Sequence, residues 1–276
     1  MSGRNGDVSL KDVLSKSTSS FHTVILESTY RADSQITGPA FARRVRVRES
    51  AEAGTLITSS RPGAQVSGLQ LFSTSRIWWR KPACLRHDVN YPGGGTAVSV
   101  VCNQELSDYV SWLGQFHTTR RPVRTLDRMR SSLFPSDVID RRTASERAGD
   151  MPLLSSSFAM SGWHLQALGD RTHCGRNGVL FHAKWGSPGR APTNWGWIDE
   201  YRAIVDLERG ILLSCECVID DQPAIVVSAT SIEFDAKIPD SVFDFEPPRR
   251  TRTIRVRPNA QNPQKGEFTD EFRHAD

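Results

Sequence analysis

The sequence predicts a mainly β protein of the α+β class, built from antiparallel strands. The clearest evidence lies in residues 201–248, where three runs alternate apolar and polar side chains. A period of two places neighbouring side chains on opposite faces of a strand, so each run has one buried face. Turns at Leu207–Gly210 and Asp220–Pro223 join the runs into a meander. The residues that share a face are Tyr201, Ala203 and Val205 in the first run, Ile211, Leu213, Cys215, Cys217 and Ile219 in the second, and Val226, Ile232 and Phe234 in the third.

The chain before this meander supplies helices and further strands. Ser9 is a suitable N-cap for a helix whose apolar residues, from Leu10 on, follow helical spacing. Residues 115–150 interrupt the strand rhythm, and a mid-chain helix is expected at Val123–Phe134. A long loop is expected at Gly186–Trp197, which is rich in Gly, Pro and Trp. Further strands are expected within Phe21–Tyr30, Phe41–Glu49, Thr55–Ser60, Gly68–Arg80, Leu85–Val89, Thr96–Cys102, Gly162–Leu168 and Gly178–Trp185.

Composition divides the chain into three parts. Residues 1–8 are polar and expected to be disordered, and residues 9–248 form one domain. Residues 249–276 are a basic and polar tail, expected to be disordered apart from a weak edge strand at Thr253–Arg257. The tail holds seven Lys and Arg and four Asp and Glu, which leaves 28 and 27 for the remainder of the chain. Because the domain is nearly neutral, no nucleic-acid partner is expected.

The cysteines and the N-terminus predict a cytoplasmic protein. Five cysteines, at positions 84, 102, 174, 215 and 217, are an odd number and widely spaced. This pattern is typical of reduced thiols in a cytosol rather than of a disulfide framework. The first residues contain no apolar signal core, and no run approaches the roughly 18 apolar residues of a membrane span.

Cys215 and Cys217 form the sharpest local pattern, and two interpretations are open. Two thiolates on one face of a strand could begin a metal site, with His173 and Cys174 as further ligands. Alternatively, they are small core residues, because they share a face with apolar neighbours such as Ile219. Core packing is favoured, since zinc sites usually show two short paired spacings. No Ser/His/Asp arrangement, nucleophile elbow or nucleotide motif is present, so no catalytic residue, metal or cofactor is expected and the protein is expected not to be an enzyme.

The C-terminal part of the domain contains IEFD at 232–235 and IPDSVFDFEPP at 238–248, and SRIWWRKPACLRHDV stands upstream at 75–89. In these segments the chain resembles the lipoprotein-carrier superfamily (LolA-, LolB- and RseB-like proteins), in particular its actinobacterial relatives. The resemblance implies that the domain is a half-open barrel made of a single curved antiparallel sheet. The N-terminal and mid-chain helices would then pack in or across its mouth. It also implies that the concave face holds an acyl chain, another apolar ligand or an acyl-bearing partner, without catalysis.

Candidate residues for such a ligand cavity come from the apolar strand positions. The neighbours Trp78 and Trp79 cannot both face inward, so one of them is expected outside the core or at a rim. The loop residues Trp195 and Trp197 are candidates for a lid, or for a plug of the open end. The cavity candidates are Leu71, Trp78, Trp79, Trp163, Leu213 and Ile232.

The alternative function is a regulatory protein–protein interaction domain with a filled barrel. Its working surface would be basic, and a protein partner is expected in that case. The arginines in Phe41–Glu49 alternate with apolar residues, which is also typical of the solvent-facing side of a half-buried strand. The basic candidates are Arg44, Arg46, Arg48, Arg249, Arg250 and Arg252.

Overall fold

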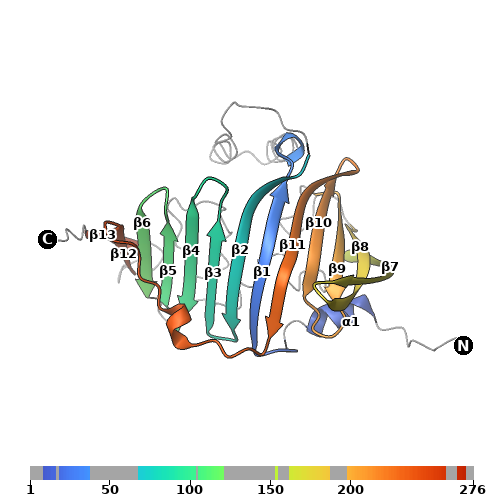
Figure 1. Ribbon diagram of the computed structural model, residues 1–276, viewed down its shortest axis with the longest axis horizontal. Helices are drawn as coiled ribbons and strands as arrows, with labels where there is room; N and C mark the ends of the chain where they lie inside the picture. The colour runs from blue at the N-terminus through green and yellow to red at the C-terminus, as the bar shows by residue number, and fades with distance from the viewer. Residues whose placement is uncertain are drawn as a thin grey trace, which may run out of the picture.

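The computed structural model describes residues 9–16, 19–37, 68–103, 105–120, 153–154, 162–186, 198–258 and 266–271. In these residues one curved, unclosed and mostly antiparallel sheet dominates, which confirms the expected half-open barrel of mainly β structure (Figure 1). The short helices are α1 (Leu10–Ser15) and the 3-10 turn η4 (Asp240–Phe243). The strands are β1 (Thr23–Ala32), β2 (Gln70–Arg80), β3 (Cys84–Asn90), β4 (Thr96–Cys102), β5 (Glu105–Val110), β6 (Gln115–Arg120), β7 (Trp163–His173), β8 (Arg176–Trp185), β9 (Glu200–Asp206), β10 (Leu212–Ile219), β11 (Gln222–Phe234), β12 (Arg252–Pro258) and β13 (Gly266–Glu271).

Strand β1 lies at the centre of the sheet and joins its two halves. The strand order is β13-β12-β6-β5-β4-β3-β2-β1-β11-β10-β9-β8-β7. Strand β1 pairs antiparallel with β2 on one side and with β11 on the other, so an early strand and a late strand lie side by side. Most other neighbours are sequential hairpins, whereas β12 returns from the C-terminal part to run parallel to β6.

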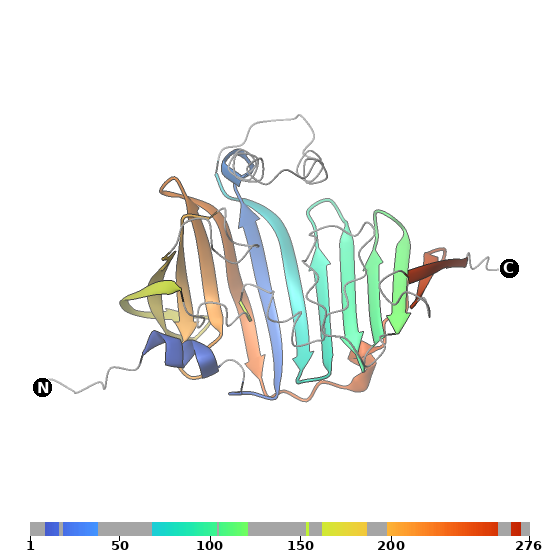
Figure 2. The same ribbon diagram turned by 180° about the vertical axis from the view of Figure 1, so that it is seen from behind.

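The main hydrophobic cluster lies on one face of the sheet, inside its curve. Figure 2 shows the sheet from the side opposite to that of Figure 1. The cluster combines buried side chains from the strands between β5 and β7 in the sheet order. Helix α1 packs against β9 and contributes Val13 and Leu14 to the cluster. Burying such a side chain fully stabilises the fold by roughly 1.5–3 kcal/mol.

A second, smaller cluster covers the opposite face of the sheet. Ile238 and Phe243, from the segment after β11, are buried against Val98 and Val100 of β4. This segment passes across the ends of the strands, at the bottom of the view, and leads into η4, which packs on β3 and β4 (Figure 1). Both faces of this part of the sheet are therefore covered by apolar side chains.

Several expected elements are confirmed and others are corrected. The three runs of the C-terminal meander are β9, β10 and β11, and the N-terminal helix is α1. Strands β5 and β6 were not predicted, and β6 lies at the start of the region expected to interrupt the strand rhythm. The strand expected in the tail at Thr253–Arg257 is present as β12, but it is not an edge strand, because it pairs with β6 on one side and with β13 on the other. Phe41–Glu49, Thr55–Ser60, Val123–Phe134 and residues 187–197 lie outside the described residues.

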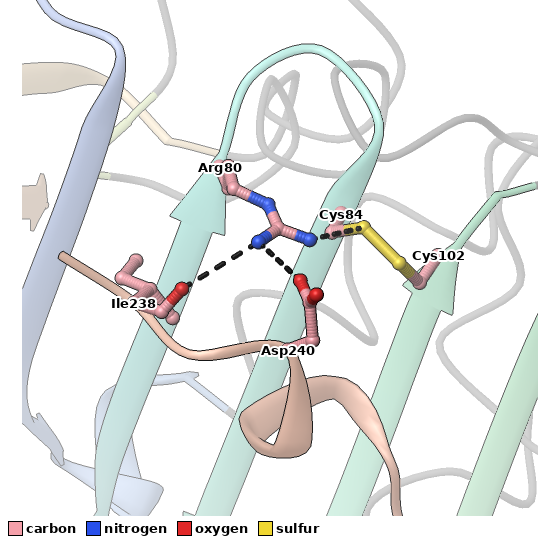
Figure 3. The surroundings of a disulfide bond; sticks show 5 residues. All are labelled: Arg80, Cys84, Cys102, Ile238 and Asp240. Carbon is pink, nitrogen blue, oxygen red and sulfur yellow. Dashed lines mark hydrogen bonds and ion pairs between the residues drawn. A yellow bond between two sulfur atoms is a disulfide. The ribbon is translucent and has the colours of Figure 1, made fainter.

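A disulfide bond joins Cys84 of β3 to Cys102 of β4, which corrects the expectation that the thiols are reduced (Figure 3). The two cysteines are 18 residues apart, but the β3–β4 register places them directly opposite each other. The Arg80 guanidinium lies beside the bond, with Nη2 3.6 Å from Cys84 Sγ and Nη1 2.6 Å from Asp240 Oδ1 (Figure 3). The disulfide therefore lies where η4 packs against the sheet.

Candidate functional site: the concave face and its aromatic rim

The structure brings together only part of the predicted cavity. Trp79 and Trp163 are buried in the main cluster, and Ile232 packs against it. Trp78 points to the opposite face and packs against the second cluster, so the expectation that one of the two neighbouring tryptophans lies outside the concave core is correct. Leu71 is exposed near the start of β2. Trp195 and Trp197 lie outside the described residues.

Leu213 is buried, but not on the concave face, which corrects its assignment. The pairing of β9 with β10 shifts between Leu212 and Ser214, so the alternation assumed for β10 breaks there. Leu212, rather than Leu213, shares the main cluster with Cys215. A β carbon on Gly178 would lie 3.4 Å from Leu213 and 2.8 Å from Ile204, which places Leu213 on the outer side of the sheet.

Aromatic side chains line much of the concave face. The Trp163 ring makes edge contacts with Trp185 at 5.1 Å and with Tyr201 at 5.3 Å between ring centroids. Phe21 likewise contacts Trp79 at 5.7 Å. Such pairs each contribute roughly 0.5–1.5 kcal/mol beyond their burial. Burial also raises the pKa of Tyr201 well above its ordinary value, so its phenol stays protonated.

A row of four aromatic residues leads from this face to solvent, and we call it the aromatic rim: Tyr30, Phe72, Tyr91 and Trp112. The ring centroids are 5.3 Å apart for Tyr30 and Phe72, 5.8 Å for Phe72 and Tyr91, and 5.1 Å for Tyr91 and Trp112. Tyr30 packs against the main cluster, whereas Phe72 is 54% exposed and Trp112 is 56% exposed. Burial, and to a lesser extent Cys217, raises the pKa of Tyr30 to about 12. The rim is thus a continuous apolar route from the core to the surface.

Local backbone structure positions the outer half of the rim. The β1–β2 pairing shifts between Tyr30 and Arg31, and Phe72 falls at this irregularity. Trp112 lies in the β5–β6 turn and covers the neighbouring β3–β4 turn, because a β carbon on Gly95 would be 3.3 Å from its ring. The backbone N–H of Thr96 donates to Ser111 Oγ at 2.8 Å, which ties the two hairpins together.

Sequence reasoning missed Phe72 and Trp112. Both stand in short uncharged segments, LQLFS at 69–73 and VSWLG at 110–114, and this lack of charge beside a large apolar residue was the available signal. Periodicity does not reveal them, because each lies at a bulge or in a turn rather than in regular strand alternation.

Cys215 and Cys217 are confirmed as core residues. Both are buried in the main cluster. The Cys215 side chain and burial raise the pKa of Cys217 well above its ordinary value, so its thiol stays protonated. The suggested metal partners His173 and Cys174 instead contact the Ala229 carbonyl oxygen at 2.9 and 3.0 Å. Among the described residues no group of three or more His, Cys, Asp or Glu could hold a metal ion.

The basic candidates do not form one described surface. Arg44, Arg46 and Arg48 lie outside the described residues. Arg249 and Arg250 are exposed, and Arg252 is half-buried at the start of β12. The Arg252 backbone N–H donates to the Gly114 carbonyl oxygen at 2.9 Å, which joins this part of the tail to the start of β6. Within the described part of the chain, no helix is long and apolar enough to cross a membrane.

Comparisons with known proteins place the chain near several solved structures. No protein-family model and no curated protein sequence matches it. A crystal structure of MucB is 14% identical with a TM-score of 0.44, and the match covers 86% of this chain and 62% of that chain. The MucA/MucB complex of Pseudomonas aeruginosa gives 12% identity and a TM-score of 0.46, covering 92% of this chain and 72% of that chain. A LolA superfamily protein from Nitrosomonas europaea is 10% identical with a TM-score of 0.31, and the match covers 86% of this chain and 98% of that chain.

These neighbours include one protein whose own description names the LolA superfamily. The chain spans about 62% of the MucB chain that it matches. At such identities and TM-scores the likeness carries no inference about a ligand or partner, and kinship with actinobacterial relatives stays a prediction.

Proposed function

We propose that the protein is a non-enzymatic binding module that holds an apolar acyl or lipid ligand against the concave face of the half-open barrel. The observation that carries this proposal is the aromatic rim, which connects the main cluster to solvent by an unbroken series of ring contacts. Tyr30 contributes to both: it packs on the cluster and contacts Phe72. An apolar ligand entering along this row stays in contact with aromatic rings from the surface inward.

The chemistry of the rim matches an acyl chain better than a polar ligand. Each methylene group that leaves water contributes about 0.8 kcal/mol, so a long chain gains affinity from contact area alone. Ring faces supply this area in a fixed geometry, because the side chains have few rotatable bonds. The Tyr91 hydroxyl places a polar group in the outer half of the rim, where a ligand head group would remain near water.

The first test is native mass spectrometry of protein purified from its own host, followed by organic extraction. A released acyl lipid, together with a raised melting temperature on adding oleate, is the expected result. Phe72→Ser should weaken oleate binding about tenfold, because it removes the central ring of the rim. The matched control Leu168→Ser changes an equally exposed apolar residue on β7 and should bind oleate normally. A clean apo mass with no thermal shift would overturn the proposal.

A second candidate is the regulatory interaction domain with a filled barrel, and a specific observation favours it. Val24, Leu26 and Val205 of the main cluster are completely buried, as expected for a packed core. A partner would then bind outside the barrel, where Arg249 and Arg250 are exposed. Arg249→Ser/Arg250→Ser should reduce capture of that partner at unchanged stability, and capture at the wild-type level would argue against this basic surface.

A further inference from the structure

We propose that one end of the sheet docks on the surface of a lipid bilayer, through the start of β2 and the β3–β4 and β5–β6 turns. We call this end the apolar tip, defined by Leu71, Phe72, Trp112 and Leu113. All four side chains are about half exposed, between 46% and 56%. The other exposed large apolar residues among those described, Leu168 and Leu207, stand elsewhere, on β7 and in the β9–β10 turn. Four of these six exposed large apolar residues therefore lie at one end of the sheet. A cluster of exposed apolar side chains is typical of an interaction site.

The apolar tip carries no formal charge that docking would strip of water. Residues 68–75, 89–96 and 109–116 contain no Lys, Arg, Asp, Glu or His. Asp33, at the end of β1, is buried, and its carboxylate accepts backbone N–H groups of Gln35 at 2.8 Å and Gly68 at 2.9 Å. Arg31 is exposed beside Leu71, where a cation suits phosphate head groups.

Exposed acidic residues at the same end of the sheet limit how far the docking region extends. Asp220 and Asp221 stand in the β10–β11 turn, and β1 and β2 separate that turn from the β3–β4 and β5–β6 hairpins (Figure 1). The contact is therefore confined to the β2–β6 half of the sheet, because a carboxylate loses its hydration when it enters the interface of a bilayer.

The size and shape of the tip favour a bilayer over a second protein. A buried aromatic side chain covers roughly 150–250 Å², so four half-exposed groups offer about 400 Å² at most. A stable protein–protein interface needs about 800 Å² on each partner. Hairpin turns that project from the ends of strands suit the interface of a fluid bilayer, which apolar groups need enter by only about 5–10 Å. Tryptophan and tyrosine also prefer this layer, because each combines an apolar ring with a polar group.

Docking at this place would bring the aromatic rim to the membrane. A lipid could then pass between the bilayer and the concave face without crossing water; this extension rests on the proposed ligand-binding function. The docking itself depends only on the apolar tip, so it can hold or fail separately.

The test is flotation of the full chain with phosphatidylcholine vesicles. Trp112→Ser/Leu113→Ser should lower the partition coefficient about tenfold or more, since both removed groups would enter the interface. The matched control Leu168→Ser/Leu207→Ser also removes two exposed apolar side chains, away from the tip, and should float like the wild type. A circular dichroism spectrum of the tip variant at the wild-type level would show that its fold is intact.

Three results would overturn the docking proposal. One is a wild-type chain that stays at the bottom of the gradient. Another is an equal loss of flotation in the tip and control variants. The third is a dimer that forms with increasing concentration of the wild type in light scattering and is lost in the tip variant, when neither the wild type nor the variant floats. The apolar tip would then be an interface between two copies of the chain. Normal flotation combined with no oleate binding would instead count against the proposed function alone.

Discussion

The imidazole Nε2 of His173 lies 2.9 Å from the carbonyl oxygen of Ala229, although three strands separate β7 from β11 in the sheet order. Ser228 Oγ lies 3.1 Å from the same nitrogen, and the neighbouring Cys174 thiol donates to the same carbonyl. The tip of the β7–β8 hairpin therefore folds back to β11. A shift in the β7–β8 pairing between Ala167 and Gly169 permits this bend, and Gly169 adopts a positive φ of 134°.

His173→Ala should loosen the β7–β8 hairpin without unfolding the domain. The variant loses the two partly buried contacts of the imidazole, with Ala229 and Ser228, which together are worth about 1–2 kcal/mol. Hydrogen exchange should quicken at the amides of β7 and β8 and stay unchanged in β3 and β4. Arg171→Ala is the matched control, because this exposed neighbour bonds only locally, to the Asp170 carbonyl, among the contacts described. Unchanged exchange in the His173 variant would contradict a latching role.

The Cys84–Cys102 disulfide predicts a simple thiol count. In denaturant without reductant, three of the five cysteines should react with an alkylating reagent, and all five should react after reduction. Cys84→Ser/Cys102→Ser should cost about 3 kcal/mol of stability, as expected when a loop of this length loses its cross-link. Cys174→Ser is the control, since that thiol is free and exposed. Five reactive thiols before reduction would refute the bond.

The same bond bears on where the protein acts. The sequence predicts a cytoplasmic location partly from the expectation of reduced thiols, but Cys84 and Cys102 form a disulfide. Stable disulfides are rare in reducing compartments. The location stays a prediction, and alkylation in intact host cells before lysis would test it.

Asp206→Ala should be the most destabilising of the charge substitutions considered. Its side chain is 1% exposed, it forms an ion pair with Arg176, and it accepts the backbone N–H groups of Glu208 and Arg209, each at 2.8 Å. Without Asp206, Arg176 keeps only the exposed Glu208 as an ion-pair partner among the described contacts, and breaking a fully buried pair costs about 3–5 kcal/mol. The control Glu208→Ala removes a side chain that is 66% exposed and should cost less than about 1 kcal/mol. Similar urea midpoints for the two variants would contradict this.

Glu200 predicts a pH dependence of stability. Its Oε2 lies 2.9 Å from both His182 Nε2 and Lys184 Nζ on the outer face of the sheet. Burial raises the pKa of this carboxyl, but hydrogen bonds from Lys184 and His182 lower it by more, so the folded-state pKa is below the ordinary 4.5. A lowered acid pKa stabilises the folded state above pH 4.5, and this contribution disappears as the pH falls through the folded-state value.

Urea unfolding between pH 3 and pH 7 tests whether Glu200 stabilises the folded state more at neutral pH than in acid. The wild type should be more stable than Glu200→Gln by about 0.5–1 kcal/mol at the upper end, and the two should converge in acid. Glu216→Gln is the control, because among the described contacts Glu216 meets only Arg202, at 3.4 Å. A difference between wild type and Glu200→Gln that does not change with pH would contradict the assignment.

The sequence by itself determined the strands and most of their buried faces. Alternation placed Tyr201 and Ala203 on one side of β9, and both lie in the main cluster. The same alternation placed Trp78 and Trp79 on opposite faces, as observed. Side-chain periodicity depends only on the backbone of the strand itself, so the buried face can be predicted without knowing which strands pair with it. It failed where the backbone is irregular, at Leu213 and at Phe72.

Only the tertiary structure decided which distant segments meet. The pairing of β1 with β11, the return of β12 to β6, the Cys84–Cys102 bond and the contact between His173 and Ala229 all join residues that no local pattern connects. The aromatic rim depends in the same way on four strand ends or turns being brought to one place. Such contacts follow from the register and curvature of the whole sheet, which are determined by the packing of both faces together rather than by any one strand.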